Sequence, residues 1–247
     1  MQYHLEDFIE ASNRCAKPED VFLLFQTAIE KLGFNSAVYT FVNDHTSIGQ
    51  KAGHGVQFSF PEHWMKYYLE KGYQNLDPVI TQVVRSRQAF TWRDLIAQGD
   101  LSVSQTTMFN QASESGLVEG VGVPLHGING EVAGLGLASH DGEVYGSKDM
   151  LSKVQLLSTQ FHLVYCQLHS EAEVVIPVLT PRELEVLKWW ALGKTMNEVA
   201  LILGCSVDNI KFHVKQIYRK LEVNSKALAI TRAVRLGLIT LERIDLS

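Results

Sequence analysis

Residues 194–221 read KTMNEVALILGCSVDNIKFHVKQIYRKL, and this stretch decides the fold of the C-terminal part of the chain. Thr195 followed by Glu198 has the spacing of a capping box, which marks the start of a helix, and Gly204 marks its end. After a short turn, Ser206 can cap a second helix. Two short helices joined by a turn are typical of a helix-turn-helix unit.

The second helix combines an apolar stripe with a polar, basic remainder. Its apolar residues recur at steps of four, three and four, so they lie on one face that must contact a core. They are Ile210, Val214, Ile217 and Leu221. The pattern predicts helix 196–203 across a phosphate backbone and helix 207–221 in the major groove of DNA.

The other faces of these two helices carry the predicted DNA contacts. Side chains suited to phosphate groups are Lys211, Lys215, Arg219, Lys220 and, at a helix start, Thr195. Side chains better placed for base edges are Asn209, His213 and Gln216. The alternative interpretation is a polar face that is only solvated, and the agreement of caps and spacing favours DNA.

One helix precedes this unit and another follows it. Thr180 and Glu183 form a further capping box, with Pro181 at the first helical position, and Gly193 stops that helix. Residues 226–236 supply the last helix. We therefore predict an all-α domain of four helices over 179–247, a linker over 171–178 and an N-terminal domain over 1–170.

The charge of the chain is divided between these two parts. From Ile176 to Ser247 there are 11 Lys and Arg against 7 Asp and Glu, whereas the preceding 175 residues have 11 against 20. Only the C-terminal part therefore suits a polyanion.

Length and composition bound the class of protein. With 247 residues, of which 46% are hydrophobic, the chain can bury two cores. The start, MQYHLEDFIE, lacks the features of a signal peptide, and no apolar run approaches a membrane span. We therefore expect a cytoplasmic protein without a membrane partner. Cys15, Cys166 and Cys205 are odd in number and far apart, so we expect no disulfide framework.

The N-terminal part alternates between helical and strand patterns. Predicted helices are 19–32, 61–70, 78–85 with Asp77 as N-cap, 106–115 and 147–169, and a strand covers 37–42. The clearest hairpin joins 118–126 to 131–140 through the turn 127–130. An α+β fold class follows.

The two strands of this hairpin have one oily and one nearly bare face. Strict alternation places Val121, Val123, Leu125, Leu135 and Leu137 on the first face. It places Gly120, Gly122, Gly134, Gly136 and Ala138 on the second. Glycine in a strand costs stability, which close approach of a ligand or of another element would explain. Tight helix packing and plain irregularity are equal alternatives.

Two sets of motifs now identify a resemblance. The sequence LTPRELEVL at 179–187, GKT at 193–195 and KFHV at 211–214, followed by RKL at 219–221, resembles the DNA-binding domain of LuxR-family regulators. The same domain occurs in two-component response regulators, but the acidic pair, aspartate and lysine of a phosphoacceptor domain cannot be placed here.

The N-terminal part resembles the acyl-homoserine-lactone receptors of that family over nearly its full length. The residues that carry the resemblance are Trp64, Tyr68, Asp77, Pro78, Trp92 and Gly120, with PLHG at 124–127. The resemblance implies an α/β/α sandwich on an antiparallel sheet, a homodimer, and transcriptional control by a diffusible autoinducer. It also implies promoter DNA and RNA polymerase as partners, and a last helix that pairs two DNA-binding domains across a dyad, so that the site is palindromic.

The resemblance further implies a role for each aromatic and acidic residue. The Trp64 indole, which is only a donor, would hold the lactone carbonyl, and the Asp77 carboxylate, which is only an acceptor, would hold the amide N–H. Tyr68 and Trp92 would form the walls of the pocket. Without the resemblance these aromatics are ordinary core packing and Asp77 is a plain N-cap.

The sequence departs from its relatives at three positions. Where several receptors have a tyrosine that donates to the acyl carbonyl this chain has Phe60, and the sheet hydroxyls facing that carbonyl align with Gly122 and Gly136. An unpaired buried carbonyl costs about 1–3 kcal/mol, or roughly 5- to 150-fold in affinity. Either the acyl carbonyl meets water, or the ligand is a bulkier molecule than an ordinary acyl-homoserine lactone. Nanomolar binding of a simple short-chain member would contradict this hypothesis.

Other functions find less support in the residues. His162, Cys166 and His169 share a helical face but give a metal at most three ligands, so we expect no metal site. No phosphate loop or nucleophile motif is present, so we expect neither an enzyme nor a cofactor other than the small signal. The runner-up is a regulator without a ligand, whose N-terminal domain serves dimerisation or a protein partner. A sensory domain that retains catalysis is a third, weaker alternative.

Overall fold

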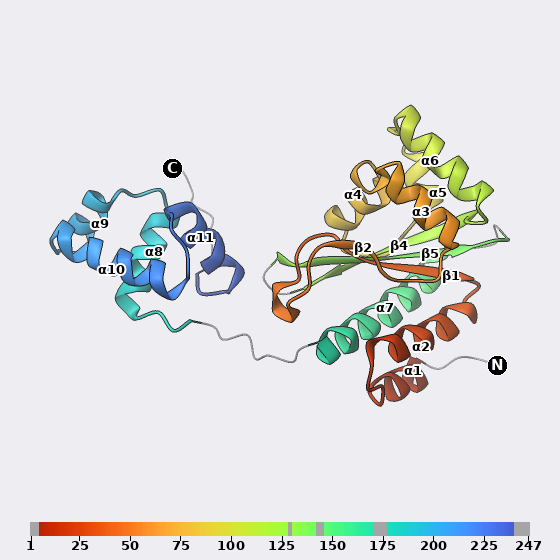
Figure 1. Cartoon of the computed structure of the whole chain (residues 1–247), viewed down its shortest axis with the longest axis horizontal. Helices are drawn as coiled ribbons and strands as arrows, with labels where there is room; N and C mark the ends of the chain where they lie inside the picture. Colours follow the sequence, from red (N-terminus) through yellow and green to blue (C-terminus); the bar gives the residue numbers. More distant parts are fainter. Residues whose placement is uncertain (1–4, 128–129, 142–145, 170–176, 240–247) are drawn as a thin grey trace. The chain divides into compact units, whose positions relative to one another are not determined.

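A computed structural model describes residues 5–127, 130–141, 146–169 and 177–239 (Figure 1). The chain contacts divide it into two compact units, one over most of the first 173 residues and one from residue 174 onward. Most of the predicted linker 171–178, and residues 128–129 of the predicted hairpin turn, lie outside the described residues. The two units are described separately below.

The first unit is built on a five-stranded antiparallel sheet with the strand order β2-β1-β5-β4-β3. The strands are β1 (Ser36–Phe41), β2 (Gly53–Phe58), β3 (Phe90–Thr91), β4 (Glu119–His126) and β5 (Val132–Ser139). The predicted hairpin of β4 and β5 is confirmed, with eight aligned residue pairs from Glu119↔Ser139 to His126↔Val132. It forms the centre of the unit because β1 pairs with β5 and β3 with β4.

Helices cover both faces of this sheet (Figure 1). One face carries α1 (Leu5–Ser12), α2 (Pro18–Glu30) and α7 (Lys148–His169). The other carries α3 (Glu62–Glu70), α4 (Pro78–Arg85), α5 (Trp92–Ala97) and α6 (Val103–Glu114). This is the predicted α/β/α arrangement of an α+β fold.

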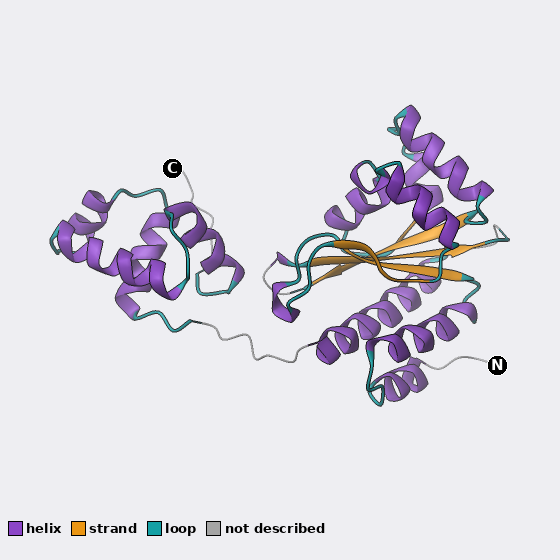
Figure 2. Cartoon of the chain, in the orientation of Figure 1, coloured by secondary structure: helices purple, strands orange, loops and turns teal. Residues whose placement is uncertain are grey.

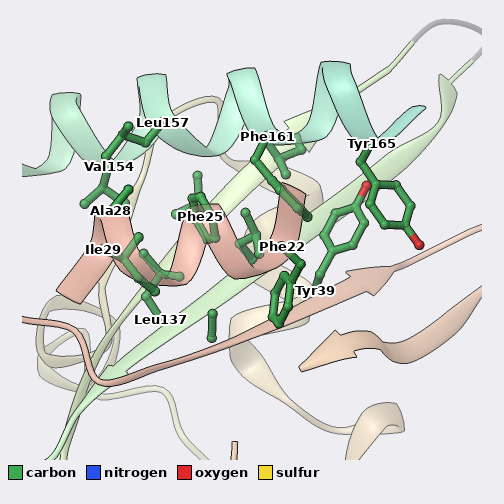
Figure 3. Packing of buried hydrophobic residues seen from close by; sticks show 14 of the residues in the cluster. Phe22, Phe25, Ala28, Ile29, Tyr39, Leu137, Val154, Leu157, Phe161 and Tyr165 are labelled. Atoms are coloured by element: carbon green, nitrogen blue, oxygen red, sulfur yellow. The ribbon is translucent and has the colours of Figure 1, made fainter. Parts of the chain in front are cut away.

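The main core lies between the sheet and the pair α2 and α7. Figure 3 shows Phe22 and Phe25 of α2 meeting Phe161 of α7 above Tyr39 of the sheet. All five apolar residues of the oily hairpin face belong to this cluster, as their alternation predicted: Val121, Val123, Leu125, Leu135 and Leu137. The glycine-rich face of the hairpin is thereby turned towards α3–α6.

In the second unit, residues 177–239 form helices joined by loops, without a strand (Figure 2). Its helices are α8 (Pro181–Ala191), α9 (Met196–Ile202), α10 (Val207–Lys220) and α11 (Lys226–Arg235). Thr180 and Thr195 each form the predicted capping box, and Ser206 accepts from the Asn209 amide at the start of α10. The predicted stripe of α10 is buried in the core of this unit, at Ile210, Val214, Ile217 and Leu221.

Two α-helices and two strands of the described residues were not predicted from the sequence. They are α1, β2, β3 and α5, of which β3 has two residues and α5 six. Strand β2 has the sequence GHGVQF and is only partly buried. Its residues do not alternate between apolar and polar, so no strand pattern could be recognised. Helix α6 begins at Val103 rather than 106, because Ser102 and Gln105 form a capping box.

Candidate functional site

A cavity lies between the glycine-rich sheet face and the helices α3–α6. The cavity and the open space at its mouth together hold about 630 Å³ free of protein atoms. Its apolar lining includes Val38, Val42, Phe60, Val79, Ile80, Val83, Trp92, Met108, Phe109, Ala112 and Leu117. Its polar lining consists of Thr40, His54, Tyr68 and Asp77, together with the indole of Trp64. A largely apolar cavity with a few convergent polar groups is typical of a small-molecule site.

The structure brings the predicted aromatic residues together around this cavity. Phe60, Trp64, Tyr68 and Trp92 all line it, and each is at most 7% exposed. The Trp64 and Tyr68 rings are 5.9 Å apart. The Trp92 indole N–H is buried without a hydrogen-bond partner within the described ranges. These residues therefore belong to a packed wall and to a cavity lining at once.

Asp77 is both the N-cap of α4 and a residue of the cavity lining, although the sequence offered an N-cap and a ligand contact as alternatives. Its Oδ1 accepts from the Val79 amide at 2.7 Å and caps α4, while its Oδ2 accepts from the Tyr68 hydroxyl at 2.8 Å. Burial raises the pKa of the Asp77 carboxyl, and the hydrogen bonds from Tyr68 and the helix start oppose that rise. The carboxylate lines the cavity with lone pairs left to accept a further N–H or O–H.

Thr40 and His54 are polar lining residues that the sequence analysis missed. The Thr40 Oγ1 lies 3.0 Å from the His54 Nδ1, and the His54 ring stacks on Tyr68 at 4.4 Å. Burial lowers the pKa of His54 to about 4, so its ring is neutral at neutral pH. The only signal in the sequence was the isolated histidine between Gly53 and Gly55, which has no strand or helix periodicity.

The structure separates the two glycines that were predicted to face the ligand. Gly136 lines the cavity, with Phe60 Cζ 3.8 Å from the place where a Cβ would lie. Gly122 does not line it, which corrects that prediction, because Phe90 of β3 pairs with Gly122 and its ring would lie 2.3 Å from a Cβ there. Strand alternation placed both residues on the correct face but could not show the ring that covers one of them.

The glycines on this face of the hairpin have two causes, the close approach of other side chains and the cavity. Trp92 lies over Gly120 and Val83 lies over Gly134, at 2.5 and 3.0 Å from the place of an added Cβ. Close approach of other elements therefore explains Gly120 and Gly122, and the cavity adjoins Gly134 and Gly136.

In the second unit, α10 presents most of the predicted DNA contacts on its surface. Asn209, Lys211, Lys215 and Arg219 are exposed, His213 and Gln216 are half-buried, and Thr195 is exposed as the N-cap of α9. Lys211 makes an exposed ion pair of 2.8 Å with Asp208, which is weak enough to open for a phosphate. The geometry gives α10 a basic outer face over an apolar inner one.

Lys220 differs from these residues because its ammonium is paired with a buried carboxylate within the unit, and its role as a phosphate contact stays a prediction. Its ammonium lies 2.7 Å from the Glu183 carboxylate, which is 4% exposed. Burial alone would raise the pKa of the Glu183 carboxyl. The hydrogen bonds from Lys220 and the Thr180 amide and the charge of Lys220 outweigh that effect, so the pKa of Glu183 lies below its usual value. Lys220 therefore joins α10 to the start of α8.

The other candidate groups of the sequence analysis do not assemble into a site. His162 lies 3.7 Å from the Cys166 sulfur, whereas His169 bonds to the Tyr165 carbonyl. Within the described ranges no group of three or more His, Cys, Asp or Glu side chains could hold a metal ion. The three cysteines are free thiols. Among the described helices, none has the length and apolar character that crossing a membrane requires.

Comparisons with known proteins match both units. Residues 17–165 match the autoinducer binding domain, and residues 177–233 match the bacterial regulatory proteins of the luxR family. The quorum-sensing-dependent regulator RpaR of Rhodopseudomonas palustris is 32% identical over 182 residues, which cover 74% of each chain. The quorum-sensing regulator RhlR of Pseudomonas aeruginosa is 27% identical over 224 residues and 90% of each chain.

Solved structures of SdiA share the fold. SdiA in complex with octanoyl-rac-glycerol has a TM-score of 0.70 at 24% identity, covering 98% of this chain and all of that one. Escherichia coli SdiA in another crystal has a TM-score of 0.68 at the same identity. The relatives are transcriptional regulators and not enzymes. The chain therefore belongs to the LuxR family of bacterial regulators and is a DNA-binding transcriptional regulator of the quorum-sensing type with an autoinducer-binding domain.

Proposed function

We propose that the signal of this regulator is an N-acyl-homoserine lactone, bound in the cavity of the first unit. The Trp64 indole donates to the lactone carbonyl, and the Asp77 carboxylate accepts from the amide N–H. The observation that carries the proposal is that one cavity contains both Trp64 and Asp77 beside an apolar space. Tyr68 and Trp92 enclose the lactone, and the valine and aromatic side chains of the remaining wall contact the acyl chain.

The chemical match is one of complementary groups. An acyl-homoserine lactone presents one ring carbonyl, one amide N–H and an alkyl chain, and the cavity presents a donor, an acceptor and an apolar wall. The Tyr68 hydroxyl donates to one carboxylate oxygen and the Val79 amide to the other, so the carboxylate is fixed before the ligand arrives. Such preorganisation reduces the ordering cost of binding.

The proposal extends to the assembly on DNA. The protein acts as a cytoplasmic homodimer in which two copies of α10 enter successive major grooves of a palindromic promoter site. Helix α11 pairs the two DNA-binding domains, and Leu228, which is 52% exposed there, supplies apolar surface for that contact. RNA polymerase is the protein partner of the dimer at the promoter.

Thermal unfolding of the purified full-length chain with N-octanoyl-homoserine lactone tests the ligand. A ligand at 100 times its Kd adds about 2.7 kcal/mol to the free energy of unfolding. Trp64→Phe keeps the ring and removes the N–H, and Asp77→Asn keeps an N-capping side chain and removes the charge, so both variants should fold yet lose most of that gain. No stabilisation by octanoyl, longer or shorter lactones would contradict the proposal and favour a regulator that needs no ligand.

A further inference from the structure

A β-bulge in β2 aims His54 at the cavity. The strand register runs from Tyr39↔Gln57 to Phe41↔Gly53, so two steps of β1 face four steps of β2. Gly55 within the bulge has a φ of 69°, and a Cβ there would lie 2.5 Å from the end of the Met65 side chain. Bulges of this kind redirect a side chain next to a functional site. Here the redirected side chain is an imidazole that lines the cavity.

The contacts of this imidazole involve its Nδ1. The Gly55 amide donates to the Thr40 Oγ1 at 3.5 Å, and the Thr40 hydroxyl lies 3.0 Å from the His54 Nδ1. We assign the hydroxyl proton of Thr40 to this contact, so that Nδ1 accepts it and the ring proton lies on Nε2. Because burial lowers the pKa of His54 to about 4, the ring is neutral at neutral pH and carries one proton.

The His54 Nε2–H is left as a donor for the cavity. Within the described part of the chain, the hydrogen bonds of His54 are those of Nδ1, and Nε2 has none. Stacking on the Tyr68 ring, at 4.4 Å with an 18° angle between planes, fixes the direction of the imidazole. Thr40 holds the ring in its plane, so the donor is oriented by two neighbours.

The surrounding wall lacks the donors that other receptors use. Phe60 has no hydroxyl, Gly136 has no side chain, and Gly134 stands opposite Thr40 on β5. Trp64 and Asp77 are assigned to the lactone end of the ligand. An oxygen on the acyl part that is buried without a partner costs roughly 5- to 150-fold in affinity. The Trp92 indole N–H is a second unpaired donor of the lining, but Trp92 encloses the lactone in the proposed function, so His54 is the donor left for the acyl part.

We propose that His54, oriented by Thr40, donates a hydrogen bond to a carbonyl oxygen on the acyl part of the signal and replaces the donors absent at Phe60 and Gly136. The inference rests on the proposed function and deepens it. Two oxygens have the required chemistry, the amide carbonyl and a 3-oxo group further along the chain. A lactone with a 3-oxo group and one without it distinguish between these two oxygens.

Calorimetric titration of the full-length protein with N-octanoyl- and N-(3-oxo-octanoyl)-homoserine lactone tests the inference. His54→Phe keeps the stacked ring and removes the N–H, so we expect a Kd raised roughly 5- to 150-fold. A loss with both probes assigns the amide carbonyl, and a loss confined to the second assigns the 3-oxo group. His54→Gln, which restores an N–H donor, recovers part of the loss. His63→Phe, on the exposed surface of α3, is the matched control and leaves both Kd values unchanged.

Thr40 is a positioning residue and has its own readout. Thr40→Val keeps the branched shape and removes the hydroxyl, so the ring nitrogens of His54 should shift from the Nε2–H pattern towards a tautomer mixture in ¹⁵N NMR spectra. Its Kd should rise by less than that of His54→Phe. Wild-type-like Kd values for His54→Phe with both probes, in a protein that binds them, overturn this inference alone. Failure of the wild-type protein to bind any acyl-homoserine lactone overturns the proposed function as well.

Discussion

The Lys220 ammonium lies 2.7 Å from the carboxylate of Glu183, and this ion pair joins the last turn of α10 to the first turn of α8. Glu183 also accepts from the Thr180 amide at 2.7 Å as the distal part of a capping box. One buried carboxylate thus serves both a helix start and a tertiary contact.

Lys220→Met should destabilise the DNA-binding domain because it leaves the Glu183 carboxylate buried without its cation. We expect a loss of about 1–3 kcal/mol at pH 7. The pKa of Glu183 is lowered in the folded protein, so the stability it contributes is present above its ordinary pKa and is lost as the pH falls through the folded value. Urea unfolding at pH 7 and pH 4 should show a smaller gap between variant and wild type at the lower pH. An equal gap at both would contradict the pairing.

Lys215→Ala and Arg219→Ala should weaken DNA binding without changing stability, because both side chains are exposed on α10. Each removed phosphate contact should reduce the slope of log K against log salt by about 0.9. Fluorescence anisotropy on a palindromic duplex at several salt concentrations measures this. Lys220→Met is the contrasting variant: compared at equal folded fraction, its salt slope should match the wild type.

Phe60→Tyr should restore a hydroxyl beside Gly136, where the ring terminus has 3.8 Å to the place of an added Cβ. A new hydrogen bond of about 1 kcal/mol should tighten binding of N-octanoyl-homoserine lactone about 5-fold. Combined with His54→Phe, the tyrosine should recover part of the lost affinity. An equal gain from the tyrosine with and without His54 would mean that the two side chains serve different ligand atoms.

Gly122→Ala should destabilise the first unit, whereas its effect on the signal should be indirect. A Cβ at residue 122 meets the Phe90 ring at 2.3 Å, so the ring or the strand must shift. We expect a loss of about 1–3 kcal/mol in the free energy of unfolding. Ligand affinity of the folded variant, measured by calorimetry well below the melting temperature, should stay close to wild type. A selective loss of affinity with unchanged stability would restore Gly122 to the cavity.

The pH dependence of Asp77 should have opposite signs for stability and for binding. Its pKa is raised by burial, so its stability contribution is present at low pH and is lost as the pH rises through the folded value. Ligand affinity should instead fall towards acid, because the protonated carboxyl is a weaker acceptor for the amide N–H. The difference between wild type and Asp77→Asn, in melting temperature and in Kd across pH 4–8, isolates this group. Parallel pH profiles for the two proteins would contradict it.

The C-terminal unit could be predicted closely because its signals are local. Thr180, Thr195 and Ser206 each cap a helix through a hydrogen bond to a residue three positions away, so sequence spacing is sufficient. The ion pair of Lys220 could not be predicted, for the opposite reason. Its partner is 37 residues distant, and helical spacing shows which side chains share a face but not which of them meet another helix.

The aromatic residues of the cavity and Asp77 could be predicted, but His54 could not. The resemblance supplied Trp64, Tyr68, Asp77 and Trp92 at once. His54 depends on a bulge whose register irregularity only the pairing of β1 with β2 defines. The cover over Gly122 likewise depends on β3, whose two residues are too few for any periodicity.

The shared duty of Asp77 constrains how this receptor can change. Its carboxylate begins α4 and fixes Tyr68, so substitutions there alter the scaffold together with the recognition of the signal. In contrast to Asp77, the side chains of Thr40, His54 and Phe60 do not cap a helix. New signal preferences can therefore arise at these three places while the architecture stays intact, and a library randomised there, rather than at the acidic position, should yield receptors retuned to other messengers.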